Sequence, residues 1–130
     1  MQKVTDTEFQ SEVMYKFKSK FIKDEISFID ENGIRNLLWC YFKDDYKNNI
    51  EIIKTIEIPK IDFSPELHIY IYFDRSEELF KTTFSDFCQY LLKLEEWEYT
   101  DAEIFDESLE WVIGMTHDDV SMLLGFQQNE

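Results

Sequence analysis

The chain has 130 residues, 44% of them hydrophobic and 17% aromatic, which is the size of one domain with ample apolar material for a packed core. This composition argues against intrinsic disorder, which requires low hydrophobicity as well as high charge. The 28 acidic and 13 basic residues give a net charge of −15, and this sign disfavours binding to nucleic acid or to an anionic membrane.

The charge is distributed unevenly along the chain. Residues 1–65 hold 12 acids and 10 bases, whereas residues 66–130 hold 16 acids and 3 bases. The 37 residues after Lys93 contain 11 acids and no lysine or arginine. Because opposite charges steer association, we expect this base-free tail to meet a basic partner.

The N-terminus and the cysteines indicate the compartment. The first six residues lack the apolar core of a signal peptide, and no apolar run approaches the ~20 residues that a membrane-spanning helix needs. We therefore expect a cytoplasmic protein with no membrane partner. Cys40 and Cys88 lie in apolar stretches and are expected to be buried thiols, because two cysteines do not make a secreted disulfide framework.

The first predicted element is an amphipathic helix from Thr7 to Phe21. Its apolar residues recur at three- and four-residue steps, namely Phe9, Val13, Met14, Phe17 and Phe21. Four lysines decorate its end, at Lys16, Lys18, Lys20 and Lys23. Cations are favoured at a helix C-terminus, and docking of the acidic tail on these lysines is the alternative interpretation.

The stretch from Ile26 to Phe42 has two interpretations. Asn32-Gly33 between apolar runs is a hairpin signal, whereas the later apolar residues follow a helical stripe. We favour a helix from about Glu31 to Asp45 with Asp30 as its N-cap. The polar run from Lys43 to Asn49 is then predicted to be a loop.

Two strands and a helix are predicted in the middle of the chain. The β-branched run from Ile50 to Ile58 predicts a strand that ends at Pro59. Leu67 to Phe73 alternates aliphatic with polar or aromatic residues and predicts a second strand. Phe84 to Leu92 has the spacing of an amphipathic helix, with Thr83 as its N-cap.

The tail returns to a two-residue period and predicts a three-stranded meander. Its strands begin near Ala102, Leu109 and Val120 and are separated by short polar turns. The expected core residues of the meander are Leu109, Trp111, Ile113, Val120 and Met122. The acids expected to face solvent are Asp101, Glu103 and Glu110 on the strands and Asp106, Glu107, Asp118 and Asp119 in the turns.

These elements predict the fold class. We expect residues 1–130 to form a single α+β domain with a mainly antiparallel sheet, which includes the C-terminal meander and packs against two or three helices. No fixed-period repeat and no Gly/Ser- or Pro-rich linker divides the chain.

The sequence carries none of the common catalytic or cofactor motifs. Three glycines cannot build a phosphate-binding loop, and neither H-E-x-x-H nor G-x-S-x-G occurs. The Asp30–Gly33 run lacks the ligand spacing of a calcium loop. The residues available for a zinc site form no paired half-sites, and they are Cys40, His68, Cys88 and His117. We therefore expect no enzymatic activity, no cofactor and no metal.

Two kinds of arrangement resemble acid–base pairs: carboxylate pairs such as Glu95-Glu96 and Asp106-Glu107, which we expect to be solvated, and His117 beside Asp118. A histidine in a strand-ending turn is more often structural and hydrogen-bonded locally than a general base. We therefore expect a structural role for His117.

The most informative pattern is the set of aromatic residues among acids. Trp and Tyr supply large rigid contact areas, and surrounding acids steer a basic partner and reject acidic ones. We expect Trp97 and Tyr99 to be exposed anchors, with a core role as the alternative, and Trp111 to be core. The candidate partner-binding residues are Glu95, Glu96, Trp97, Glu98, Tyr99, Asp101, Glu103, Asp106, Glu107 and Glu110.

The segment from Phe105 to Asp119, FDESLEWVIGMTHDD, resembles the C-terminal signature of small bacterial proteins, many of which are similar to immunity proteins of polymorphic toxin systems. The resemblance covers about fifteen residues and brings no catalytic assignment. It implies a cytoplasmic antagonist that blocks a toxin, often a nuclease. The alternatives are an acidic interaction protein or nucleic-acid mimic without a toxin partner, an enzyme of unrecognised type, and a charge that only aids solubility.

Overall fold

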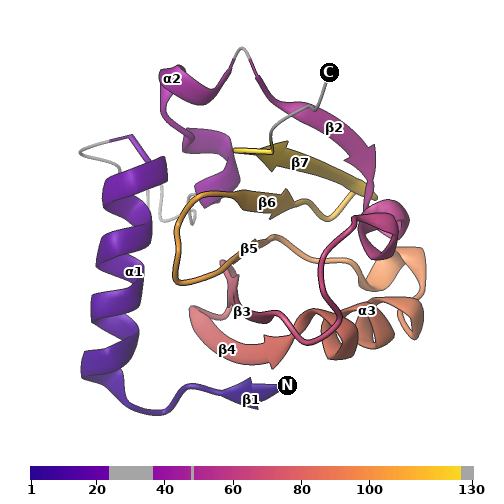
Figure 1. Ribbon diagram of the computed structural model, residues 1–130, viewed down its shortest axis with the longest axis horizontal. Helices are drawn as coiled ribbons and strands as arrows, with labels where there is room; N and C mark the ends of the chain where they lie inside the picture. The colour runs from indigo at the N-terminus through magenta and orange to yellow at the C-terminus, as the bar shows by residue number, and fades with distance from the viewer. Residues whose placement is uncertain (24–36, 48, 127–130) are drawn as a thin grey trace.

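A seven-stranded antiparallel sheet in the order β1-β4-β3-β5-β6-β7-β2 forms the centre of the computed structural model (Figure 1). The model describes residues 1–23, 37–47 and 49–126. The strands are β1 (Gln2–Lys3), β2 (Glu51–Lys54), β3 (His68–Phe73), β4 (Glu78–Thr83), β5 (Ala102–Phe105), β6 (Val112–Met115) and β7 (Val120–Leu124). The helices are α1 (Thr7–Phe21), α2 (Asp44–Lys47) and α3 (Phe84–Leu92), with 3-10 helices η1 (Leu38–Tyr41), η2 (Thr55–Lys60) and η3 (Glu96–Glu98).

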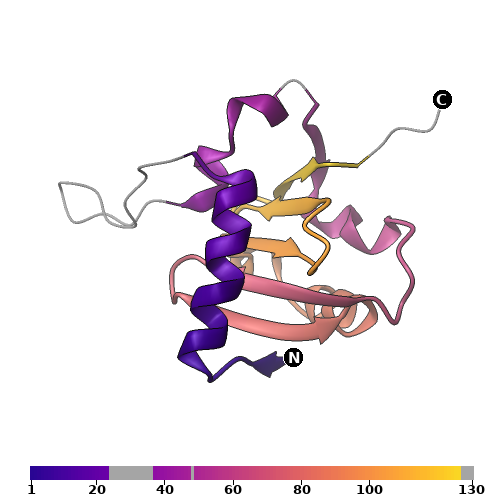
Figure 2. The ribbon, with the colours of Figure 1, turned by 60° about the vertical axis from the view of Figure 1, so that its left-hand side comes forward.

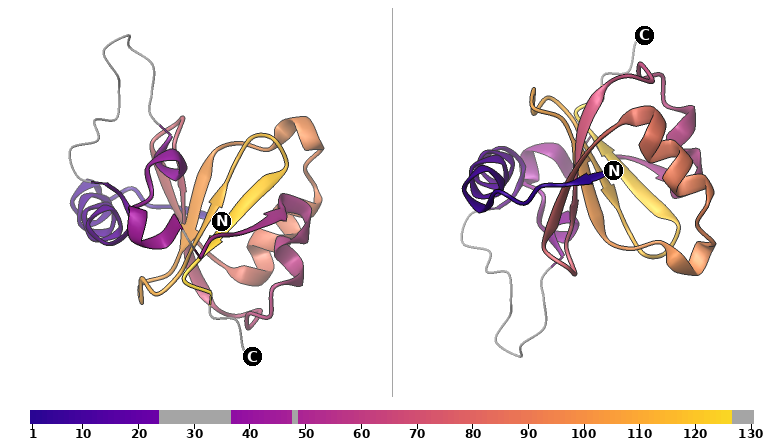
Figure 3. Two further views of the ribbon diagram at one scale, coloured as in Figure 1. Left: turned by 90° about the horizontal axis from the view of Figure 1, so that it is seen from above. Right: turned by 90° about the horizontal axis from the view of Figure 1, so that it is seen from below.

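Helices cover both faces of the sheet. Helix α1 lies across one face together with η1, and α3 lies on the other face together with η2 (Figures 2 and 3). We call these the α1 face and the α3 face. Because neighbouring residues of a strand point to opposite faces, each central strand supplies both cores. In β5, for example, Ile104 packs on the α3 face and Phe105 on the α1 face.

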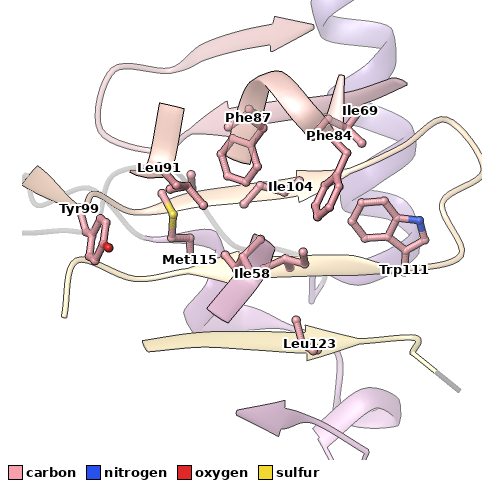
Figure 4. Close-up of a cluster of buried hydrophobic side chains, with 13 residues drawn as sticks. Ile58, Ile69, Phe84, Phe87, Leu91, Tyr99, Ile104, Trp111, Met115 and Leu123 are labelled. Atoms are coloured by element: carbon pink, nitrogen blue, oxygen red, sulfur yellow. The ribbon is translucent and has the colours of Figure 1, made fainter. Parts of the chain in front are cut away.

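The α3 face has a large apolar core. Figure 4 shows Phe84, Phe87 and Leu91 of α3 lying over Ile104 and Met115 of the sheet, and all five side chains are buried. The further members of this cluster include Ile58, Ile69, Tyr99, Trp111 and Leu123. Tyr99 and Trp111 lie at opposite ends of the cluster (Figure 4).

The predicted fold class is confirmed, because the described chain forms one α+β domain with an antiparallel sheet and helices on its faces. The predicted helix from Thr7 to Phe21 is α1, and Asp6 caps it by accepting from the backbone N–H groups of Glu8 and Phe9. Helix α3 is also confirmed, with Thr83 Oγ1 accepting from the backbone N–H of Asp86 at 3.2 Å. The meander is confirmed as β5, β6 and β7 in consecutive antiparallel register.

The predicted helix from Glu31 to Asp45 is wrong in its described part. Leu37 and Phe42 have extended backbones, so η1 and α2 are separate short elements. Phe42 forms a β-bridge with Ile22 and is buried, and these tertiary contacts override the local helical stripe. The Asn32-Gly33 hairpin and the Asp30 cap lie outside the described residues.

Two other predictions in this region need correction. The run from Lys43 to Asn49, predicted as a loop, contains α2, whose first-turn acids Asp44 and Asp45 suit the positive end of a helix. The strand predicted over Ile50 to Ile58 stops at Lys54, and the chain turns into η2. A hydrogen bond of 2.8 Å between the Thr55 and Ser121 hydroxyls links the start of η2 to β7. Ile58 of η2 then packs in the α3 face core.

Strands β1 and β4 were absent from the sequence prediction. Strand β4 (ELFKTT) pairs with β3 along its full length, through a turn in which Glu77 has a positive φ of 56°. Strand β1 has only two residues and pairs with β4 at the edge of the sheet. Neither segment has enough apolar alternation to stand out without its partner strand.

The burial predicted for five further residues also differs from the structure. Cys40 is exposed and Cys88 is half-buried, because η1 directs Leu38 inward and leaves Cys40 at the surface. In the meander Trp111 and Ile113 are buried, as predicted, whereas Leu109 and Met122 are only partly buried. Val120, at the start of β7, is 38% exposed and pairs with Lys54 of the edge strand β2.

Within the described residues, no helix combines the length and apolar character needed to cross a membrane.

Candidate functional site

The structure divides the ten predicted partner-binding residues into three groups. Glu95, Glu96, Trp97 and Glu98 are exposed on and beside η3. Tyr99, Asp101 and Glu103 are buried. Asp106, Glu107 and Glu110 lie in the β5–β6 connection, at the other end of β5 from η3. The predicted residues therefore do not form one continuous surface.

Helix η3 is a single turn that turns its tryptophan outward. The backbone N–H of Glu95 donates to Glu98 Oε1 at 3.0 Å, and the backbone N–H of Glu98 donates to the carbonyl of Glu95 at 2.9 Å. Leu94 and Tyr99, which flank this turn, pack into the α3 face core. With both flanks pointing inward, Trp97 points outward and is 81% exposed.

The surroundings of Trp97 are acidic and contain further exposed apolar side chains. Leu92, at the end of α3, is 66% exposed, and Ile56 of η2 is also exposed. The pKa of Tyr99 is raised by its burial and by the charges of Asp119 and Glu96, which places the β6–β7 turn close to η3. Elements η2, η3 and this turn lie at the same end of the sheet (Figures 1 and 3). We define the η3 surface as Leu92, Glu95, Glu96, Trp97 and Glu98.

Tyr99 was expected as an exposed anchor and is instead core. It is 6% exposed and closes one end of the α3 face cluster. The physical reason is the 3-10 turn before it, which leaves only one of the two aromatic residues free to point outward. The alternative core interpretation of the sequence was therefore right for Tyr99 and wrong for Trp97.

Asp101 is a buried carboxylate at the centre of a polar cluster instead of a solvent-facing acid, and its partners Arg75 and His117 reach it from the surface. Its Oδ1 accepts from Trp39 Nε1 at 2.9 Å, and its Oδ2 accepts from Arg75 Nε at 2.9 Å. His117 Nδ1 lies 3.0 Å from Oδ1. The cluster joins η1, the β3–β4 turn, the start of β5 and the β6–β7 turn. We call these four residues the Asp101 cluster.

The pKa values of the Asp101 cluster follow from these contacts. Burial by itself raises the pKa of Asp101, but hydrogen bonds from His117, Trp39 and Arg75 outweigh it and hold this pKa below its usual value. The pKa of His117 is raised, mainly by its hydrogen bond to Asp101 and by the negative charge there. The contacts thus stabilise the ionised form of Asp101 and the protonated form of His117 relative to the free side chains.

Glu103 is the second predicted surface acid that the structure buries. It lies on the α1 face with Phe105, beneath η1 and beside Asp74, which accepts from the Leu38 backbone N–H at 3.3 Å. Burial and the neighbouring Asp74 raise the pKa of Glu103 well above its usual value. Asp101 and Glu103 share one side of β5, as the alternation predicted, but α1 and η1 cover that side.

The Asp101 cluster has the form of an acid–base pair, but its geometry favours a structural role. An enzyme would use an aspartate-oriented histidine to take a proton from a nucleophile. Here His117 Nε2 faces Asp118 Oδ2 at 3.4 Å. Although Cys40 lies at the surface, partial desolvation of its thiol and the charges of Asp101 and Asp74 raise the thiol pKa, which is opposite to the shift that activates a cysteine.

The expected structural role of His117 agrees with this geometry, although its main partner differs from the local one expected. That partner, Asp101, lies sixteen positions earlier in the chain. One sequence signal pointed to the burial of Asp101 and Glu103. Phe105 has the same parity in β5, and so large an apolar residue indicates that its side of the strand is covered.

The acids of the β5–β6 connection have mixed roles. Asp106 organises the turn by accepting from the Ser108 backbone N–H at 3.0 Å and from Trp111 Nε1 at 3.2 Å. Glu107 and Glu110 are exposed. Within the described part of the chain, no group of three or more His, Cys, Asp or Glu side chains is arranged to hold a metal ion.

Comparison of the chain with protein-family models, with curated proteins and with solved structures gives no match. The function must therefore be inferred from the residues of this chain.

Proposed function

We propose that the protein is an inhibitor of the immunity type, which binds a basic protein through the η3 surface and blocks it. The observation that carries this proposal is the position of Trp97, which is 81% exposed between exposed glutamates at positions 95, 96 and 98. An inhibitor of this kind needs no catalytic group, only a surface complementary to its target.

The tryptophan would supply most of the binding energy. Interfaces obtain their affinity from a few large side chains that become fully buried, and Trp is the residue most enriched among them. Trp97 lies on a short turn fixed by two hydrogen bonds, so little conformational freedom would be lost on binding. Exposed Leu92, at the end of α3 and shortly before η3 in the chain, would extend the apolar contact.

The glutamates would supply direction and selectivity. With a net charge of −15, the protein attracts basic partners and repels acidic ones over distances comparable to the Debye length. Such steering raises association rates by orders of magnitude at low salt. Fast capture suits an antidote, since a toxin must be blocked before it acts.

The resemblance to immunity proteins enters the proposal through the fold. In the segment from Phe105 to Asp119 most apolar side chains are core residues, including Phe105, Trp111, Val112, Ile113 and Met115. The signature thus describes how β5, β6 and their turns pack. The η3 surface lies outside it, in a segment whose exposed residues are free to suit a particular toxin. A nuclease, which is basic where it holds phosphate, is the target class this surface fits best.

The test is binding to the small basic domain encoded at the end of the neighbouring secreted protein, if the adjacent gene encodes one, measured by calorimetry and by stopped-flow association. Wild-type protein should form a 1:1 complex whose association rate falls steeply with added salt. Trp97→Ala should weaken binding at least about tenfold, as expected for a hot-spot residue. Reversing all three glutamates to lysine should slow association.

Tyr15→Ala is the matched control, because Tyr15 is an equally exposed aromatic side chain on α1, on the other face of the sheet. It should leave binding unchanged. A salt-insensitive association rate, or equal effects of the Trp97 and Tyr15 substitutions, would contradict the proposal. Competition by DNA for many basic proteins would favour a nucleic-acid mimic instead.

A further inference from the structure

Two small hollows meet beside Tyr70 on the α1 face. The first, of about 190 Å³, lies between α1 and the β5–β6 connection, and its lining includes Phe9, Val13, Phe105 and Leu109. The second, of about 180 Å³, lies over β3 and β4. Both are bordered by Tyr70 and Glu107. Sites for whole small molecules are usually ~300–1,000 Å³, so each hollow has room for one protein side chain.

The floor of the first hollow is aromatic. The Tyr70 ring lies 6.3 Å from the Phe9 ring and 5.7 Å from the Phe105 ring, measured between centroids. The face of an aromatic ring is electrostatically negative and attracts cations. This chain already shows that attraction, because Lys81 Nζ lies 4.5 Å from the centroid of the Phe9 ring.

The rim of the hollows is charged. Asp106 is held by its turn, and Glu12 pairs with Lys16 at 3.1 Å. Glu107 is exposed at the boundary of both hollows, and its charge contributes to a raised pKa of Tyr70 after the larger effect of burial. A carboxylate and an aromatic ring therefore both border a space of side-chain size, whose lining also includes Lys16 in the first hollow and Lys81 in the second.

We propose that these hollows receive an arginine side chain of the basic partner, with its guanidinium on the Tyr70 ring and hydrogen-bonded to Glu107. This inference rests on the proposed function, because that function makes the partner a basic protein. Arginine fits better than lysine, since a planar guanidinium stacks on a ring and pairs with both oxygens of a carboxylate at once. An apolar side chain would use the floor but leave Glu107 without a new partner.

The hollows would add a second contact at the end of β5 opposite to η3. Trp97 precedes β5 and Glu107 follows it, so a partner that engages both would have to reach from one end of this strand to the other and from the α3 face to the α1 face. The two contacts differ in kind, since the η3 surface inserts a tryptophan into the partner and the hollows accept a side chain from it.

The inference is tested without the partner by NMR titration of the isotope-labelled protein with N-acetyl-arginine amide. The backbone amide signals of Val13, Glu107 and Leu109 should shift, with saturation in the range of about 1–10 mM that a single side chain allows. N-acetyl-citrulline amide, which has the same shape and no charge, should bind at least about fivefold more weakly. Glu107→Gln should weaken arginine binding by a similar factor.

Glu96→Gln is the matched control, as it removes an exposed glutamate from the η3 surface and should leave the titration unchanged. Equal binding of citrulline, tighter binding of N-acetyl-norleucine amide, or no shift at about 10 mM arginine amide would overturn the inference. Trp97→Ala should not affect this titration. The proposed arginine binding in the hollows and the proposed binding role of the η3 surface can therefore be contradicted independently of each other.

Discussion

The indole nitrogen of Trp39 lies 2.9 Å from Oδ1 of Asp101, and this hydrogen bond fastens η1 to the α1 face of the sheet. The same carboxylate accepts from Arg75 and from His117, so one buried side chain holds segments that are up to 78 positions apart in sequence, from Trp39 to His117. A group with this many partners should matter for stability even though it has no part in the proposed binding surface.

Replacing Asp101 with alanine should lower the free energy of unfolding by about 1–3 kcal/mol, because the partly buried indole N–H of Trp39 loses its acceptor and the solvent-exposed Arg75 and His117 lose their partner. The loss is measured by urea unfolding at neutral pH. Asp118→Ala is the control, since the Asp118 side chain is exposed and should matter by less than about 0.5 kcal/mol. Equal effects of the two substitutions would show that the Asp101 cluster contributes little.

The raised pKa of His117 predicts a loss of stability on the alkaline side. Its folded-state pKa lies above its value of about 6.5 in the unfolded chain, because Asp101 stabilises the protonated ring. The contribution is therefore complete below about pH 6.5 and disappears as pH rises through the folded-state pKa. NMR titration of the His117 ring measures this pKa directly.

In Asp101→Asn the His117 pKa should fall relative to wild type, because the negative charge is gone. Asp118→Asn should change it less, since Asp118 contributes less than Asp101 to the shift. A pKa that is the same in wild type and in Asp101→Asn would contradict the proposed electrostatic link.

The regular elements were predictable because their signals are local. The three- and four-residue spacing of apolar residues from Thr7 to Phe21 is a property of the helix itself, and α1 has these bounds. The alternation after Asp101 likewise belongs to the strands of the meander. Strand β4 lacked such a signal, because its register comes from pairing with β3.

The candidate site was harder to predict because burial depends on distant segments. Alternation correctly placed Asp101 and Glu103 on one side of β5, but the cover of that side comes from α1 and η1, residues about sixty or more positions earlier. The acids between Glu95 and Glu110 looked contiguous in sequence. A strand of four residues, which extends about 3.3 Å per residue, separates them into two groups.

Glu103→Gln should preserve or raise stability at pH 8. The pKa of buried Glu103 is raised, so its ionised form is disfavoured in the folded protein, and wild type loses stability as pH rises from about 4.3 through the folded-state value. Glutamine has nearly the same shape and cannot ionise. The difference in unfolding free energy between the two proteins should shrink from pH 8 to pH 5.

Urea unfolding at both pH values measures this difference, with Glu110→Gln as the exposed control. The control should follow wild type at both values. If Glu103→Gln is less stable than wild type at pH 8, then the ionised carboxylate stabilises the fold, and the raised pKa of Glu103 is contradicted.

Gly125→Ala should be among the most damaging single-methyl changes in the protein. Gly125 has a φ of +79°, and an added Cβ would lie 2.2 Å from the backbone carbonyl oxygen of Glu110. The atoms that the added methyl group meets belong to the backbone of Glu110 and Trp111, just before β6. Removing this clash therefore requires β6 and the end of β7 to move apart. We expect a loss of at least about 2 kcal/mol in urea unfolding.

Gly114→Ala is the matched control, since it adds the same methyl group to a buried position of β6. Its Cβ would meet the Phe42 ring and Trp39 Cβ at 3.1 Å, and side chains can yield where a carbonyl cannot. The loss should therefore be smaller than for Gly125→Ala. The reverse order would mean that Phe42 and Trp39 cannot shift to admit the methyl group, whereas the backbone around Gly125 can, and would contradict this prediction.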